Sequence, residues 1–264
     1  MTNAHPIGIL DSGFGGLSVA RAVRATLPHE NILYTADCGH APWGDRTDAF
    51  IDARVDAQVA FLLEHGIKAL VIACNTATAV SAARLRARYD FPIVGIEPAV
   101  LPAARQTTSS VIGVMATTKT LSSDKYRHLR AQVPPDIRVL DCPCPGLMDC
   151  VEKGAFCAPE TQALLDTYVS PLIKAGADSL VLGCTHYPFL MPAIARTAGP
   201  GVRLIDPAPA VAQQLRRRLD AAGLLNDTNA PGQASFYTSD ARPEREAILR
   251  LLWPGHPSLH PMSV

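Results

Sequence analysis

Two cysteines occupy matching settings in distant parts of the chain. Cys74 ends the apolar run in HGIKALVIACNTATA (residues 65–79), and Cys184 ends the one in AGADSLVLGCTHYPF (175–189). Small polar residues follow each thiol. A single cysteine in an apolar run is most often a small apolar filler. Two cysteines at equivalent strand ends argue against that explanation and indicate a shared chemical role.

Several roles are open to a thiol, and they make different demands on its neighbours. A metal site needs further ligands at each cysteine, and Asn75 and Thr76 offer Cys74 none that is soft. A Cys-His hydrolase uses only one cysteine. Proton transfer uses both: a thiolate removes a proton from one face of a carbon, and a thiol returns another from the opposite face. Because a free thiol titrates near pH 8.5, a modest shift makes it a usable base at neutral pH.

The elements that must position these thiols are short apolar runs alternating with longer helical patterns. The runs are apolar throughout, as strands covered on both faces should be. The pattern therefore predicts parallel α/β sheets with helices outside. The predicted strands are residues 6–10, 31–36, 69–73, 92–96, 110–115, 137–142, 179–183 and 202–206.

The chain also repeats itself. IGILDSG (7–13) resembles IGVMATT (112–118), and PIVGIEPAV (92–100) resembles VRLIDPAPAV (202–211), in the same order as the cysteine motifs. We therefore expect two pseudo-symmetric α/β domains, over residues 1–100 and 101–207, with the segment 208–264 packing back on the first. Since ligands of open α/β sheets bind beyond the carboxyl ends of the strands, we expect the active site in the cleft between the domains.

Charge and composition exclude several classes of protein. The formal net charge is zero and the pI is about 7.1, so no basic field is available for nucleic acid or for a membrane surface. The one dense basic cluster, Arg216–Arg218, is interpreted as the solvated face of a helix. We find no signal peptide and no apolar run long enough to cross a bilayer. Seven cysteines without framework spacing favour reduced thiols and a cytoplasmic location.

The motifs together resemble those of a known family. IGILDSGFGGLSV, YTADCGHAPWG, VIACNTAT, VGIEPA, GVMATTKT, VEKG and LGCTHYP occur in family order over residues 1–210. In this respect the chain resembles the glutamate racemases of the cofactor-independent aspartate/glutamate racemase family. The resemblance implies interconversion of L- and D-glutamate without pyridoxal phosphate or metal, with D-glutamate supplied for peptidoglycan, and hence for cell-wall biogenesis and cell shape. It also implies a homodimer.

The same resemblance implies roles for individual residues. Cys74 acts on the D-substrate and Cys184 on the L-substrate, with Asp11 and His186 beside the respective thiols. Two further acidic residues match catalytic positions of the family, namely Asp37 and Glu152. Simpler explanations stay open: Asp11 as a turn residue, His186 as a structural histidine and Glu152 as a solvated helix residue.

Substrate carboxylates require hydrogen-bond donors, and helix N-termini and hydroxyl groups supply them. Any one of the threonines could instead cap a helix. The family commonly has Pro-Tyr-Gly where this chain has Trp43 between Pro42 and Gly44, so a tyrosine hydroxyl is missing. The predicted substrate-binding residues are Asp11, Ser12, Pro42, Trp43, Gly44, Asn75, Thr76, Thr117, Thr118, Thr120, Thr185 and His186.

Three other functions compete with this interpretation. An aspartate or hydantoin racemase would share the fold, although CTHYP argues against it. A non-catalytic glutamate or protein binder would not need both thiols. A pyridoxal-phosphate enzyme requires a Schiff-base lysine, and only Lys119 lies near a predicted strand-end loop. The remaining cysteines are expected to pack rather than to bind metal: Cys38, Cys142, Cys144, Cys150 and Cys157.

Overall fold

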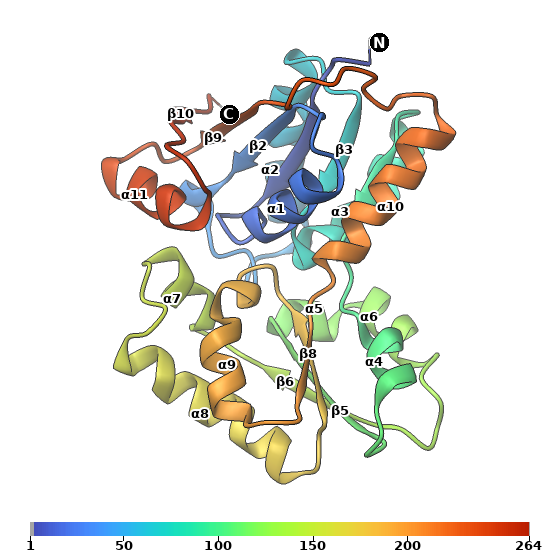
Figure 1. Cartoon of the computed structure of the whole chain (residues 1–264), viewed down its shortest axis with the longest axis vertical. Coiled ribbons are helices and arrows are strands. Elements are labelled where there is room, and N and C mark those ends of the chain that lie inside the picture. The colour runs from blue at the N-terminus through green and yellow to red at the C-terminus, as the bar shows by residue number, and fades with distance from the viewer. Residues whose placement is uncertain (1–2, 264) are drawn as a thin grey trace. The chain divides into compact units, whose positions relative to one another are not determined.

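The computed structural model describes residues 3–263, and the chain divides into two units (Figure 1). Unit 1 comprises Met1–Ile96 and Ala208–Val264, and unit 2 comprises Glu97–Pro207. Each unit is a parallel β-sheet flanked by helices. The predicted α/β class is therefore confirmed.

Unit 1 contains a six-stranded sheet in the order β10-β9-β2-β1-β3-β4, and every neighbouring pair is parallel. Every residue of β1, β2 and β3 is buried, as expected for apolar strands covered on both faces. The strands are β1 (Ile7–Asp11), β2 (Ile32–Ala36), β3 (Ala69–Ile72), β4 (Ile93–Gly95), β9 (Ala234–Thr238) and β10 (Leu259–Pro261).

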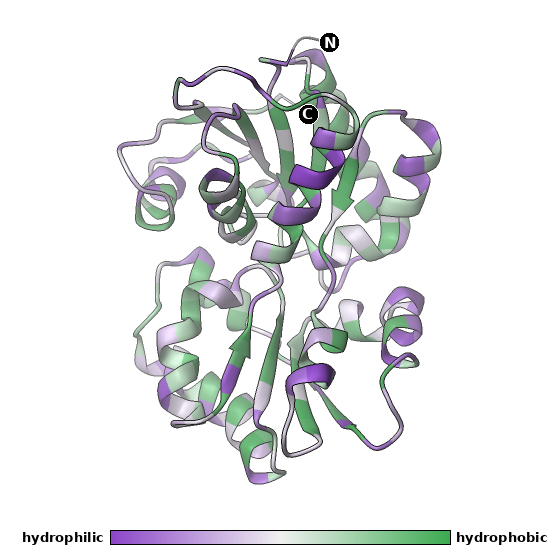
Figure 2. Ribbon diagram, turned by 45° about the vertical axis from the view of Figure 1, so that its right-hand side comes forward, coloured by the Kyte–Doolittle hydropathy of each residue, from purple (hydrophilic) through white to green (hydrophobic). Residues whose placement is uncertain are grey.

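The helices of unit 1 pack in two groups, α1 against α10 and α2 against α3. The connection from β1 to β2 and the connection from β2 to β3 run in opposite directions across the sheet. Because crossovers between parallel strands are right-handed, α1 and α2 therefore lie on opposite faces of the sheet. Figure 2 shows apolar strands and a hydrophilic outer side of α10, and Arg216–Arg218 are exposed there as predicted. The helices are α1 (Leu17–Thr26), α2 (Asp48–Glu64), α3 (Asn75–Arg88), α10 (Ala208–Ala221), α11 (Pro243–Leu252) and the 3₁₀ turn η1 (Cys38–His40).

The C-terminal segment completes the sheet of unit 1. Strand β9 pairs in parallel with β2, from Ala234 beside Ile32 to Thr238 beside Ala36. The Arg24 guanidinium on α1 also donates to the Gln233 carbonyl at 2.9 Å. The sequence pattern did not predict β10, because three residues that include a proline form no apolar run.

Unit 2 contains a four-stranded parallel sheet in the order β6-β5-β7-β8. This order matches β2-β1-β3-β4 of unit 1, in agreement with the repeat in the sequence. The outer strands β6 and β8 are partly exposed, whereas β7 is buried throughout. The elements are α4 (Val100–Gln106), β5 (Val111–Ala116), α5 (Thr118–Ser122), α6 (Asp124–Arg130), β6 (Arg138–Pro143), α7 (Leu147–Glu152), α8 (Pro159–Lys174), β7 (Ser179–Gly183), η2 (Tyr187–Leu190), α9 (Met191–Ala198) and β8 (Arg203–Ile205).

No helix among residues 3–263 combines the length and the apolar character that crossing a membrane requires.

Candidate active site

The two thiols follow the inner strands of their sheets. In unit 1 the chain leaves β1 toward β2 and leaves β3 toward β4, in opposite directions along the sheet. The corresponding point in unit 2 lies between β5 and β7. Such reversals are where open α/β sheets bind ligands, at the carboxyl ends of the strands. Cys74 and Cys184 lie two residues and one residue beyond the ends of β3 and β7, respectively.

The loop after β1 folds around the carboxylate of Asp11, which is fully buried. One carboxylate oxygen accepts the Ser12 N–H at 2.7 Å and the other accepts the Gly16 N–H at 2.6 Å. A Cβ on Gly16 would lie 2.9 Å from the Ala73 Cβ and from the Tyr34 hydroxyl, so only glycine fits there. Both bonds go to backbone N–H groups of the loop, as in the turn role that the sequence leaves open for Asp11, and they hold Ser12 beside Cys74.

Cys74 forms the N-cap of α3 and is 7% exposed. Its Sγ accepts the Ala77 N–H at 3.5 Å and lies 3.9 Å from the Ser12 Oγ. The first turn of a helix presents unpaired N–H groups and a partial positive charge. This position favours the thiolate form of a cysteine and also suits a carboxylate ligand.

Asn75 begins α3 and is 5% exposed. Among the residues that the structure describes, neither its Oδ1 nor its Nδ2 has a hydrogen-bond partner. A buried polar group without a partner costs about 1–3 kcal/mol. An amide with two such atoms, next to Cys74, has the properties of a side chain that pairs with a ligand.

The indole of Trp43 packs into the core of unit 1 and is 1% exposed. Its neighbours in that cluster include Leu10, Ile51 and Val55. The flanking Pro42 is exposed and Gly44 is half-buried. The indole N–H has no hydrogen-bond partner among the described residues, so it is a second possible donor of this segment beside the backbone N–H groups.

Asp37 follows β2 and is fully buried in an ion pair. Its carboxylate accepts two hydrogen bonds from the Arg54 guanidinium, both at 2.8 Å, and one from His40 Nδ1 at 2.9 Å. Burial acts to raise the pKa of Asp37, but hydrogen bonds from Arg54, Ser239 and His40 outweigh it and hold that pKa below its usual value. No pattern in the sequence predicted Arg54 and Ser239 as partners of Asp37, because pairing across distant elements leaves no local signal.

A hydrogen-bonded chain of three buried side chains lies in unit 2. Cys184 Sγ is 3.6 Å from His186 Nδ1, and His186 Nε2 is 2.8 Å from Glu152 Oε1. His186 and Glu152 are 2% and 8% exposed, so Glu152 is not a solvated helix residue. Burial acts to lower the pKa of His186, but the bonds to Cys184 and Glu152 outweigh it and raise the pKa well above its usual value. A charged imidazole then donates to both the sulfur and the carboxylate.

Local structure explains how these three side chains meet. Strand β7 ends at Gly183, where a Cβ would lie 2.8 Å from the Met115 carbonyl oxygen of β5. The close approach of the two strands thus requires glycine immediately before Cys184. The turn η2 follows His186, and α7 ends at Glu152 with its carboxylate against the imidazole.

The predicted threonines differ in their surroundings. Thr117 caps α5: its hydroxyl oxygen accepts the Thr120 N–H at 3.2 Å and its hydroxyl donates to the Thr120 Oγ1 at 2.9 Å. Thr118 is exposed, whereas Thr76 and Thr185 are buried beside the two thiols. The capping interpretation therefore holds for Thr117.

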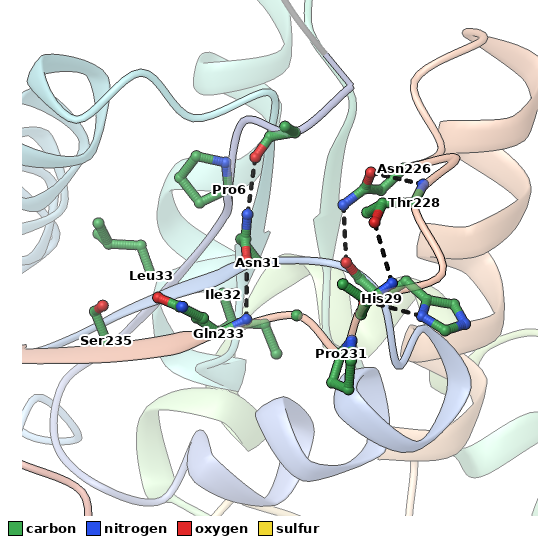
Figure 3. Close-up of a pocket in the computed structure, with 13 residues that line it drawn as sticks. Pro6, His29, Asn31, Ile32, Leu33, Asn226, Thr228, Pro231, Gln233 and Ser235 are labelled. Atoms are coloured by element: carbon green, nitrogen blue, oxygen red, sulfur yellow. Dashed lines mark hydrogen bonds between the residues drawn. The ribbon is translucent and has the colours of Figure 1, made fainter.

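A separate pocket of about 460 Å³ lies at the amino ends of the strands of unit 1 (Figure 3). Its polar groups bond to each other: Asn31 donates to the Ala4 carbonyl and accepts the Gln233 N–H, both at 2.9 Å. Asn226 likewise donates to the His29 carbonyl at 2.8 Å. The pocket marks the seam at which the C-terminal segment joins the sheet, and it is at the opposite edge from Asp11 and Cys74.

Comparison with known proteins gives a consistent result. The model of the Asp/Glu/Hydantoin racemase family matches residues 17–215. The chain is 46% identical to the glutamate racemase of Methylococcus capsulatus over 98% of its own length and 96% of that protein. It is 51% identical to the glutamate racemase of Ectopseudomonas mendocina over 94% of each chain.

Solved structures agree with the sequence relatives. The glutamate racemase RacE1 of Bacillus anthracis superposes with a TM-score of 0.88 at 32% identity, over 99% of this chain and 98% of that one. The Escherichia coli glutamate racemase, solved with L-glutamate and the activator UDP-MurNAc-Ala, has a TM-score of 0.86 at 29% identity, over 98% and 99% of the two chains. The chain therefore belongs to the Asp/Glu/Hydantoin racemase family and, within it, to the glutamate racemases.

Proposed function

We propose that this chain interconverts L- and D-glutamate by a two-base mechanism in which Cys74 and Cys184 exchange a proton with Cα from opposite faces. The observation that carries the proposal is the equivalent placement of the two thiols after β3 and β7, each with its own set of donors. A single nucleophile would leave one of these arrangements without a purpose. The mechanism requires both sulfurs to reach the same carbon.

In the direction from L- to D-glutamate, the Cys184 thiolate removes the Cα proton. The C–H electron pair passes into the α-carboxylate, and the Cys74 thiol returns a proton to the other face. The enzyme then holds a thiol at Cys184 and a thiolate at Cys74, which is the state required for D-glutamate. The charged imidazole of His186 stabilises the Cys184 thiolate, and Glu152 keeps the imidazole charged and oriented.

Binding of the substrate carboxylates falls to neutral donors. The Asn75 amide, the first N–H groups of α3 and the Ser12 hydroxyl surround Cys74. The Trp43–Gly44 backbone offers further N–H groups without the indole. Donors of this kind hold an anion without adding a charge that competes with the two thiols. In unit 2 the proposed donors are hydroxyl or backbone N–H groups of Thr117, Thr118, Thr120 and Thr185; the Thr117 hydroxyl also donates to Thr120.

Asp11 and Asp37 receive different roles. Asp11 orients Ser12 and adds negative charge near Cys74, where a substrate ammonium can bind. Asp37 is held by Arg54, so we assign it to positioning rather than to proton transfer. Asp37→Asn should therefore lower the free energy of unfolding while keeping kcat within a few-fold at a temperature where the variant is folded. Complete loss of turnover in a folded Asp37→Asn enzyme would contradict this assignment and show that Asp37 takes part in catalysis.

The cellular role follows as part of the same proposal. The chain supplies D-glutamate for peptidoglycan, and its relative from Escherichia coli binds a muramic-acid nucleotide as activator. None of the seven cysteines, all of which the structure describes, forms a disulfide, and a mechanism that depends on two thiols needs the reducing conditions of the cytoplasm. We also propose a homodimer on family grounds, which light scattering of the purified protein tests directly.

The deciding experiment incubates the purified enzyme with L-glutamate in D2O without added cofactor. We expect loss of the Cα proton signal in the NMR spectrum together with loss of optical activity. Inversion without deuterium incorporation would contradict transfer through two thiols whose protons exchange with the solvent. A parallel incubation with L-aspartate tests the alternative of an aspartate racemase, which would racemise L-aspartate instead. Glutamate that stays unchanged would favour a non-catalytic binding protein.

A further inference from the structure

A second pair of thiols lies in unit 2, outside the set used by the mechanism. Cys142 is near the end of β6 and Cys144 follows it by two residues, in the sequence DCPCPG. Their sulfur atoms are 3.9 Å apart, and the Cys144 thiol donates to the Cys142 carbonyl oxygen at 3.3 Å as well as toward the Cys142 sulfur. Cys142 is half-buried, whereas Cys144 is 3% exposed. One sulfur is therefore reachable from solvent and the other lies directly behind it.

The two thiols differ in chemical character. The hydrogen bond from Cys144 lowers the pKa of Cys142, and the same bond together with burial raises the pKa of Cys144. The thiolate is the form that attacks a disulfide. Cys142 thus has the properties of an attacking thiol, and Cys144 those of a resolving thiol that acts once Cys142 has reacted.

We propose that Cys142 and Cys144 form a thiol–disulfide exchange site for low-molecular-weight disulfides, and that its oxidation state reaches Cys184 through α7. In the first step the Cys142 thiolate attacks a disulfide RSSR, forming a mixed disulfide and releasing RS⁻. Cys144 then attacks the Cys142 sulfur, its proton leaves, and the second RS⁻ departs. The protein loses two thiol hydrogens and the small molecule is reduced to two thiols.

The link to the reaction centre is short. Helix α7 begins at Leu147, three residues after Cys144, and ends at Glu152, whose carboxylate bonds to His186. The Tyr187 hydroxyl donates to the Cys144 carbonyl at 3.4 Å, which ties the dithiol to the turn after His186. Closing the sulfur pair from 3.9 Å to the disulfide length of about 2.0 Å draws the two side chains together, and in this proposal the strand end moves with them. Such a shift at the start of α7 displaces Glu152 from the imidazole.

The site itself is tested by peptide mapping, which does not depend on the proposed racemase mechanism. The protein is equilibrated in glutathione buffers of increasing oxidised fraction, alkylated and digested with trypsin. We expect the peptide of residues 139–153, which contains three cysteines, to carry one alkyl group and an internal disulfide instead of the three alkyl groups of the reduced form. Exposed Cys157 is the matched control and should carry a stable mixed disulfide instead.

Single substitutions assign the bond. Cys150→Ser should leave the internal disulfide in place, whereas Cys142→Ser and Cys144→Ser should abolish it. A peptide that stays reduced while Cys157 is modified, or a bond that involves Cys150, would overturn the exchange site. A persistent mixed disulfide at Cys142 would also overturn it, since the resolving step would then not occur.

The effect of the disulfide on Cys184 is tested by measuring the rate of racemisation, and this part of the proposal rests on the proposed function. Oxidised enzyme should racemise glutamate more slowly, by up to about 100-fold if Glu152 moves by about 1 Å, and dithiothreitol should restore the rate. Cys142→Ser, treated identically, should keep its rate, which controls for direct oxidation of Cys74 and Cys184. A disulfide that forms without any change in rate would refute the transmission and leave the exchange site standing.

Discussion

Replacement of Glu152 by glutamine tests the chain of side chains behind Cys184. The substitution keeps the shape of the side chain but removes its charge, which lies 2.8 Å from His186 Nε2 on a buried side chain. A hydrogen bond to a charged partner contributes about 1.5–3 kcal/mol. We therefore expect the ratio of charged to neutral imidazole at a given pH to fall by about 10-fold to 150-fold.

The measurement is a pH titration of the His186 ring by ¹⁵N NMR, with the signal assigned by its loss in His186→Asn. In the unmodified protein the ring should stay charged through neutral pH, since its pKa is raised. In Glu152→Gln the pKa should move down, and kcat should fall because the Cys184 thiolate loses its cationic partner. Glu160→Gln removes an exposed carboxylate on the neighbouring α8 and serves as the matched control.

The same shift has a consequence for stability. Because the folded-state pKa of His186 lies above its unfolded value, the charged ring stabilises the fold fully below the unfolded pKa. That contribution is lost as pH rises through the folded-state pKa. In urea titrations at several pH values, the free energy of unfolding should depend less on pH in Glu152→Gln than in the unmodified protein. An unchanged titration of His186 in a folded Glu152→Gln protein would refute the reasoning.

Three further predictions concern the thiols, the substrate amide and a buried ion pair. Cys74→Ser and Cys184→Ser should each abolish racemisation, while Cys184→Ser retains deuterium exchange into D-glutamate and Cys74→Ser retains it into L-glutamate, as NMR in D2O can show. Asn75→Ala should raise the KM for glutamate by about 5-fold to 150-fold without lowering the Tm, because its two unpaired atoms stabilise nothing in the free protein. Lys68→Met should lower the free energy of unfolding by about 3–5 kcal/mol in urea titrations. The Lys68 ammonium lies 2.6 Å from the Glu30 carboxylate and both residues are buried, so the substitution leaves a buried carboxylate without its cation.

Each of these has an outcome that contradicts it. The two enantiomers are equal in free energy, so kcat/KM must be the same in both directions for any variant. The face on which each thiol acts is therefore assigned from deuterium exchange at Cα. A single variant that exchanges deuterium into both enantiomers would contradict that assignment. A lower Tm in Asn75→Ala would show that the amide has a structural partner. A Lys68→Met protein as stable as the parent would show that the ion pair is replaceable by apolar packing.

Much of the fold could be predicted because its determinants are local. Fully apolar runs such as residues 69–73 are typical of strands covered on both faces, and their alternation with helical patterns predicts the parallel sheets. The repeated cysteine motifs then place Cys74 and Cys184 at equivalent strand ends. A strand as short as Leu259–Pro261 has no such periodicity, and it exists because β9 offers it an edge.

The sequence by itself determined the α/β class, the repeat and the two thiols, since each depends on neighbours along the chain. Only the tertiary structure decided which acidic residue lies beside a catalytic group and which is held in an ion pair. Arg54 of α2 engages Asp37, whereas α7 delivers Glu152 to His186. It also decided that the Trp43 ring packs in the core of unit 1. These outcomes depend on how helices pack on a sheet, and no local pattern of residues records that packing.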